Sequence, residues 1–205
     1  KGEHRPSVAK AVLSRTELLL TTKKLTKEEV IKELENLRFS WRGGSFEFSL
    51  LRKLGGLYLE AGDYRKGLRT LRTVVSNFRG HPDSIKITEK MGLAFQDLYL
   101  NGAADKIPPV RSLALFEEFK ELTPSGKDGD KLIQRLADRL AAVDLLEEAA
   151  KLLEQQIKFR LEGAEKAKVG AQLATIYILD KKPGKALETL RGTNISGQPA
   201  AASRE

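Results

Sequence analysis

The chain has 205 residues, of which 40% are hydrophobic and 31% charged, so most of its length is expected to fold rather than to be disordered. Its formal net charge is +8, carried by small clusters of Lys and Arg along the chain, which favours a solvated surface or attraction to an acidic partner. It contains no Cys, which excludes disulfides, thiolate metal sites and a Cys nucleophile. No apolar run is long enough to cross a bilayer.

Residues 1–45 are expected to form an atypical N-terminal helical hairpin. Thr26, followed by two glutamates, marks the start of its second helix, and Val30 and Leu34 supply that helix with apolar side chains. Four aromatic residues then cluster around Gly43-Gly44: Phe39, Trp41, Phe46 and Phe48. This cluster is interpreted as part of a core that joins the hairpin to the rest of the chain, the alternative being an exposed docking site.

From Phe46 onward the sequence repeats one spacing. Each copy begins with a leading Leu, which is followed at once by a small residue. A large apolar residue stands four positions after the leading Leu, a second small residue stands 13 positions after it, and another Leu stands 17 positions after it. Small residues at fixed spacing are expected where two helices approach closely. The pattern therefore predicts a stack of helical hairpins. The three copies are Leu54, Gly55, Tyr58, Gly67, Leu71; Leu136, Ala137, Leu140, Ala149, Leu153; and Leu173, Ala174, Tyr177, Ala186, Leu190.

A fourth copy lies between the first two. Met91 and Phe95 stand 37 positions after Leu54 and Tyr58, which is also the distance from Leu136 to Leu173. The next copy follows 45 positions after Met91, and the eight extra residues are assigned to the segment 101–109, which is too long for the turn inside a hairpin. Allowing for this insertion, Ser112 takes the small position and Phe116 the position four later. The inserted loop is a candidate contact surface through Lys106, Pro108 and Pro109.

Turn residues agree with these hairpins. Gly62 ends one helix and Asp63 is suited to cap the next. Pro183 stands just inside the start of the last helix, where its missing N–H is harmless. The expected units lie near 48–81, 85–126, 130–163 and 167–192, within an array spanning 46–192, and residues 193–205 are expected to be a flexible tail.

This pattern resembles that of the tetratricopeptide repeat (TPR) superfamily over about residues 46–192. The Leu-Gly-x-x-Tyr core and the later small and apolar positions match the family, whereas its Trp position holds Leu51 and Ile133, the repeats are about three residues longer, and one unit carries the insertion. The resemblance implies an all-α fold, a right-handed α-solenoid of about four hairpins. It also implies a non-catalytic role in protein binding.

In such hairpins the first helix lines the inner, concave surface. Residues of these helices that do not occupy packing positions are candidates for contact with a partner. The partner would be a protein or peptide segment of acidic character. Lys131 and Arg135 match part of the family's carboxylate clamp, but its Asn residues are absent and Glu89 stands where a Lys is required. The candidate positions are Arg52, Leu59, Lys131, Gln134, Arg135, Lys168 and Thr175.

Catalytic chemistry and cofactors are not indicated. The two histidines, His4 and His81, have no partner at a metal-ligand spacing, and adjacent glutamates on a helix point about 100° apart, which does not suit acid–base catalysis. Two alternatives stay open: a nucleic-acid-binding repeat protein, suggested by the charge, and a self-assembling module whose terminal hairpin stacks on another copy. The start at Lys1 suggests a fragment of a larger, bacterial protein, and the composition fits a cytoplasmic or a bacterial-envelope location equally.

Overall fold

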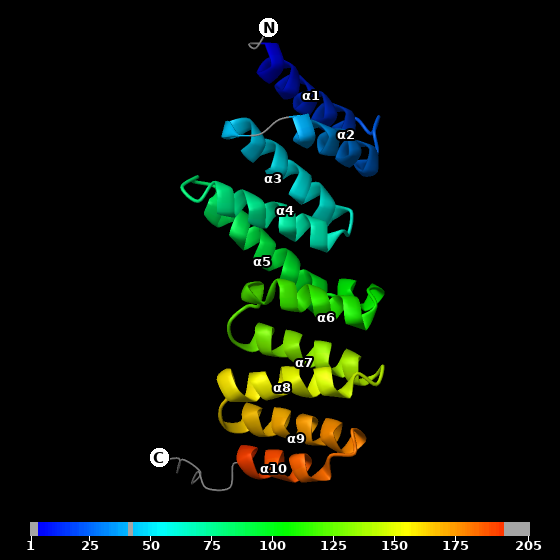
Figure 1. The fold of residues 1–205 in the computed structure, drawn as a ribbon, viewed down its shortest axis with the longest axis vertical. Coiled ribbons are helices and arrows are strands. Elements are labelled where there is room, and N and C mark those ends of the chain that lie inside the picture. The colour runs from blue at the N-terminus through cyan, green and yellow to red at the C-terminus, as the bar shows by residue number, and fades with distance from the viewer. Residues whose placement is uncertain (1–3, 41–42, 195–205) are drawn as a thin grey trace, which may run out of the picture. The chain divides into compact units, whose positions relative to one another are not determined.

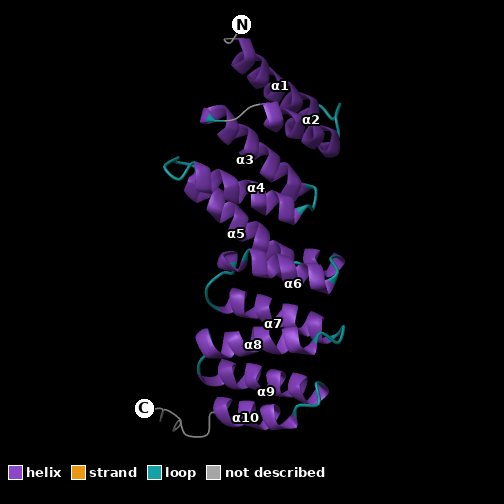
Figure 2. Cartoon of the chain, in the orientation of Figure 1, coloured by secondary structure: helices purple, strands orange, loops and turns teal. Residues whose placement is uncertain are grey.

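The computed structural model describes residues 4–40 and 43–194, and in these residues all the regular structure is helical (Figures 1 and 2). The chain divides into two compact units, Lys1–Phe95 and Gln96–Glu205, with the boundary inside one helix. Trp41 and most of the expected tail lie outside the described residues. The α-helices are α1 (His4–Thr21), α2 (Lys27–Ser40), α3 (Gly44–Glu60), α4 (Tyr64–Asn77), α5 (Ser84–Leu100), α6 (Pro109–Glu118), α7 (Lys127–Ala141), α8 (Leu146–Phe159), α9 (Gly163–Leu179) and α10 (Pro183–Thr193); η1 (Ala103–Lys106) and η2 (Lys120–Leu122) are 3-10 helices.

In the first unit, α1 and α2 pack as a hairpin that continues directly into the repeats. The start of α2 is a reciprocal cap, because Thr26 Oγ1 accepts from the Glu29 N–H while the Glu29 carboxylate accepts from the Thr26 N–H. Val30 and Leu34 are fully buried and form one cluster with Leu54 and other apolar residues of α3. The atypical N-terminal hairpin, formed by α1 and α2, is therefore packed against α3.

The aromatic cluster near Gly43 divides between core and surface. Phe46 and Phe48 are buried, and Phe46 belongs to the cluster of Val30 and Leu34. Phe39 is exposed instead, because it stands at the end of α2 beyond the last buried turn. The core interpretation is therefore correct for the two phenylalanines of α3 and wrong for Phe39.

Helices α3 and α4 approach each other at two facing glycines. A Cβ at Gly67 would lie 3.1 Å from the carbonyl oxygen of Gly55 and 2.6 Å from Leu59 Cδ2, and a Cβ at Gly55 would lie 2.7 Å from Leu71 Cδ2. The two helices pack together closely because neither position carries a side chain. Asp63 caps α4 as expected, accepting from the Lys66 N–H.

In the second unit, α7 pairs with α8 and α9 pairs with α10, and α8 also packs on α9. Alanines replace the facing glycines at the close approaches, and all four are buried: Ala137, Ala149, Ala174 and Ala186. Pro183 stands in the first turn of α10, as expected. The fold is thus an all-α arrangement of sequential hairpins within each unit.

One polar contact recurs at the same register position in both units. The Tyr58 hydroxyl donates to Glu35 of α2, and the Tyr177 hydroxyl donates to Glu154 of α8. Each ring also lies under a lysine ammonium, Lys66 or Lys185, at 5.4 Å from the ring centroid. Glu35 follows Leu34 as Glu154 follows Leu153, so α2 contacts α3 in the way that α8 contacts α9.

These tyrosines are expected to resist ionisation in the folded protein. Burial raises the pKa of Tyr58, Tyr99 and Tyr177 above the ordinary value of 10.0, and the glutamates beside Tyr58 and Tyr177 raise it further. The contribution of these three tyrosines to the stability of the folded protein is complete below pH 10. It is lost as the pH rises from 10 towards the folded-state pKa, because in that range the tyrosines of the unfolded chain ionise and those of the folded chain do not. In an alkaline titration, phenolate absorbance from these residues should therefore appear together with the loss of helical circular dichroism. Titration of all the tyrosines near pH 10 in a fully helical protein would contradict this expectation.

The insertion is ordered against α7. Residues 103–106 form the short helix η1, and the Asp105 carboxylate forms ion pairs with Arg139 (3.3 Å) and Arg135 (3.5 Å). Arg139 also donates to the carbonyl of Ile107 at 2.9 Å, and Arg135 donates to the carbonyl of Leu100. Ser112 and Phe116 are buried, as the register with the insertion removed requires.

Candidate functional site

A hollow in the first unit lies between α3 and the start of α5. It has a volume of about 510 Å³ and is open to solvent, and Leu13 of α1 borders it. We call it the α3–α5 groove. Its size is within the range of ligand-binding clefts in proteins.

The floor of the groove is apolar. Leu57, Leu71 and Ile87 line it, and each is almost completely buried by the hairpin packing beneath. At Gly56 a Cβ would meet Lys90 Nζ at 3.2 Å, so the Lys90 side chain lies across this part of α3. The missing side chain at Gly56 leaves room for a cation over an apolar surface.

Basic side chains surround this floor. Arg52 and Lys53 come from α3, and Lys86 and Lys90 come from α5. Two acidic residues also line the groove, and both form ion pairs: Asp83 with Arg52 at 3.0 Å and with Lys86 at 4.0 Å, and Glu60 with Lys27 at 3.4 Å. The groove therefore has an excess of positive charge.

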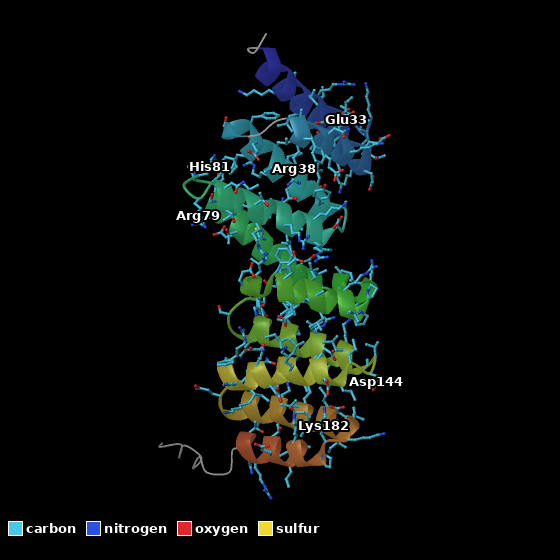
Figure 3. The ribbon with its side chains drawn as sticks, viewed as in Figure 1. Glu33, Arg38, Arg79, His81, Asp144 and Lys182 are labelled. Carbon is cyan, nitrogen blue, oxygen red and sulfur yellow. The ribbon has the colours of Figure 1, made fainter. Side chains whose placement is uncertain are left out.

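The connector between α4 and α5 positions Asp83. His81 lies in this connector (Figure 3). Its ring stacks on Phe48 of α3 with centroids 3.6 Å apart, and its Nδ1 accepts from the Asp83 N–H at 3.1 Å. The Arg52 guanidinium lies 5.7 Å from the centroid of the same Phe48 ring. The contacts of His81 thus lie in the same segment that places the Asp83 carboxylate beside Arg52.

The predicted contact residues occupy different surroundings. Of those in the first unit, Arg52 lines the α3–α5 groove, whereas Leu59 points to Gly67 in the α3–α4 interface. In the second unit Lys131, Lys168 and Thr175 are exposed on α7 and α9, and Gln134 is half-buried. Arg135 binds the insertion. Within the insertion Lys106 and Pro108 are exposed and Pro109 begins α6.

Three basic residues of the groove are missing from the sequence-based candidates: Lys53, Lys86 and Lys90. The register could have found the last two, because they stand 45 positions before Lys131 and Arg135, the same offset that separates Met91 from Leu136. Lys53 stands 37 positions before Lys90.

In the described part of the chain, no group of three or more His, Asp or Glu side chains is placed to hold a metal ion. Among the same residues, 4–40 and 43–194, no helix is long and apolar enough to span a bilayer.

Sequential helical hairpins, packed one after another within each unit, define the class of α-helical repeat proteins. Solved structures with similar folds include MamA from Desulfovibrio magneticus RS-1 (14% identity, 90% of this chain and 92% of that chain, TM-score 0.36). They also include BtubC from P. vanneervenii (13%, 98% and 88%, TM-score 0.39) and a protein described as a kinesin light chain of Podosopora anserina with nearly identical TPR-like repeats (19%, 96% and 99%, TM-score 0.38). At TM-scores below 0.5 these likenesses do not specify how the hairpins are arranged. No protein-family model matches the sequence, and no curated protein matches it either.

Proposed function

We propose that this protein is a non-catalytic interaction module that binds an acidic, partly apolar segment of a partner protein in the α3–α5 groove. The observation that carries the proposal is the combination of four basic side chains with an apolar floor in one cleft of about 510 Å³. Leucine or isoleucine side chains of the partner would contact Leu57 and Ile87, and its carboxylates would contact the surrounding ammonium groups.

The groove has more basic than acidic side chains even when its ion pairs are counted, which favours an anionic ligand. Asp83 already neutralises part of the charge of Arg52, and Glu60 is shared with Lys27, which does not line the groove. An arriving carboxylate can replace Asp83 at Arg52 or join Lys90 over Gly56 with little rearrangement of the backbone. Because the groove is open to solvent, these charges contribute mainly to selectivity and association rate.

The test uses defined peptides in place of an unidentified partner. A labelled peptide of alternating Leu and Glu is expected to bind, measured by fluorescence anisotropy, and its Leu-Gln counterpart to bind much more weakly. Arg52→Glu combined with Lys90→Glu should reduce affinity by roughly 100-fold, since two repulsive contacts replace two attractive ones. Lys151→Glu combined with Lys158→Glu on α8, two exposed cations outside the groove, is the matched control for net charge.

Two outcomes would overturn this proposal. One is equal binding of the Glu and Gln peptides. The other is equal loss of binding in the groove variant and in the Lys151→Glu, Lys158→Glu control. A single-stranded RNA oligonucleotide serves as a competing polyanion, and tighter, more steeply salt-dependent binding of the RNA would favour the nucleic-acid alternative.

The second unit offers a further set of positions to the same partner. Lys131 and Lys168 occupy the register position of Lys86, and Gln134 and Thr175 lie on the same two helices, α7 and α9. We propose them as a second contact surface that is confined to this unit. The Lys131→Glu, Lys168→Glu variant is expected to weaken binding of an acidic peptide to this surface and to leave binding of the Leu-Glu peptide in the α3–α5 groove unaffected.

A further inference from the structure

One carboxylate of the α3–α5 groove already occupies a cation of the same groove. Asp83 Oδ2 lies 3.0 Å from a guanidinium nitrogen of Arg52, and Asp83 Oδ1 lies 4.0 Å from the ammonium of Lys86. The side chains of Asp83 and Arg52 are 32% and 51% exposed, so this ion pair is accessible from solvent. An anion that enters the groove therefore meets Arg52 in its paired state.

Asp83 also stands at the N-cap position of α5. The helix begins at Ser84, and the Asp83 carbonyl accepts its first hydrogen bond, from the Ile87 N–H at 3.0 Å. Asp is a preferred N-cap residue, because its carboxylate can accept from the N–H of the second or third helical residue. Among the described residues, no N–H of the first turn of α5 donates to the Asp83 carboxylate, which is turned towards Arg52 instead.

The start of α4 shows the other arrangement that an N-cap aspartate can adopt. The carbonyl of Asp63 accepts the first hydrogen bond of α4 from the Gly67 N–H at 2.9 Å, and its side chain accepts from the Lys66 N–H at 3.2 Å. Lys66 is the third residue of α4, as Lys86 is the third residue of α5. Thus one aspartate caps its helix, and the other, at the same helix position, forms an ion pair across the groove.

We propose that Asp83 is an internal competitor for the carboxylates of the partner segment, and that a bound segment displaces it from Arg52 to the N-cap of α5. This inference rests on the function proposed for the groove. The displaced carboxylate keeps favourable contacts, because it exchanges a guanidinium for a backbone N–H at the positive end of a helix. A segment must compete with Asp83 for Arg52, so this residue determines how acidic a segment has to be in order to bind.

The exchange requires the movement of one side chain. The backbone of Asp83 is bonded on both sides, since its N–H donates to His81 Nδ1 at 3.1 Å and its carbonyl accepts from the Ile87 N–H at 3.0 Å. The His81 ring in turn stacks on Phe48 of α3. Rotation about the Cα–Cβ bond of Asp83 therefore moves the carboxylate between its two partners and leaves these backbone hydrogen bonds in place.

The first test is the affinity of Asp83→Asn for the Leu-Glu peptide, measured by fluorescence anisotropy. Asn caps helices about as well as Asp but has no charge with which to hold Arg52. The variant is expected to bind about two- to fivefold more tightly, the range that one exposed ion pair supports. Glu60→Gln is the matched control: it makes the same change of charge in the groove, but Glu60 pairs with Lys27, which does not line the groove. Equal gains in the two variants would reflect net charge alone, and Asp83 would then not be a competitor.

The second test follows the Lys86 amide by NMR and separates this inference from the function of the groove. Saturating Leu-Glu peptide is expected to move the Lys86 amide proton downfield in the wild type, because it gains the Asp83 carboxylate as acceptor, and not in Asp83→Ala.

The same shift is expected without any peptide in Arg52→Gln, which leaves Asp83 without its guanidinium, and not in Lys53→Gln on the same helix. An unchanged Lys86 amide in Arg52→Gln shows that the proposed exchange does not occur, whether or not the peptide binds. Absence of peptide binding to both the wild type and Asp83→Asn refutes the function proposed for the groove instead.

Discussion

Replacing Gly129 with Ala is expected to lower the free energy of unfolding by about 3 kcal/mol, at the upper end of the usual cost of overpacking. A Cβ at this position would lie 2.0 Å from the carbonyl oxygen of Pro124 and 2.5 Å from Arg160 Nη2. The carbonyl cannot recede freely, because Arg160 Nη2 donates to it at 2.9 Å. Arg160 is itself held by Asp130 at 2.7 Å, so the added methyl group would disrupt the whole contact between the loop before α7 and the end of α8.

Urea-induced unfolding followed by circular dichroism measures this effect. Gly184→Ala is the matched control in the same unit, since no heavy atom lies within 4 Å of the position of its Cβ. The control is expected to be unchanged or stabilised by up to about 1 kcal/mol, as Ala favours helix over Gly. If Gly129→Ala were as stable as Gly184→Ala, the tight contact with Pro124 would not exist in solution.

Replacing Gly67 with Ala should destabilise the α3–α4 hairpin by about 1–3 kcal/mol, although Ala is the better helix former. The new methyl group would overlap Leu59, and the carbonyl of Gly55 at 3.1 Å limits any shift of the helix. Adding Leu59→Ala should recover part of the loss, because it removes the overlapping atoms. A double-mutant cycle in urea unfolding should therefore show coupling between residues 59 and 67, and strictly additive effects would contradict the proposed close approach.

The same interface connects stability to binding. A Cβ at Gly55 would overlap Leu71, and Leu71 also lines the floor of the α3–α5 groove. The facing glycines therefore place an apolar side chain where a partner segment is proposed to bind. The hairpin core and the groove floor share residues, so changes at the glycines should be compared with changes at the basic residues before a loss of binding is attributed to charge.

The sequence alone determined the hairpins. Two kinds of signal made this possible. The Asp63 cap and Pro183 depend on the local geometry of a helix start, whereas the leading Leu and the small positions make contacts that repeat every 37 residues and so leave a periodic pattern. The insertion could be located for the same reason, since it displaces the pattern by eight residues.

Only the tertiary structure decided which polar residues meet. Arg135 matched a binding position in sequence, yet its guanidinium binds the insertion at Asp105. Arg52 meets Asp83 beside the contact of His81 with Phe48, in a connector that has no counterpart in the repeat pattern. Gly129 is required by the approach of Pro124 and Arg160 from segments outside its own helix. A long, flexible charged side chain pairs with whichever opposite charge lies close to it in the folded protein. The spacing of apolar residues along the sequence contains no information about which charged groups lie close together.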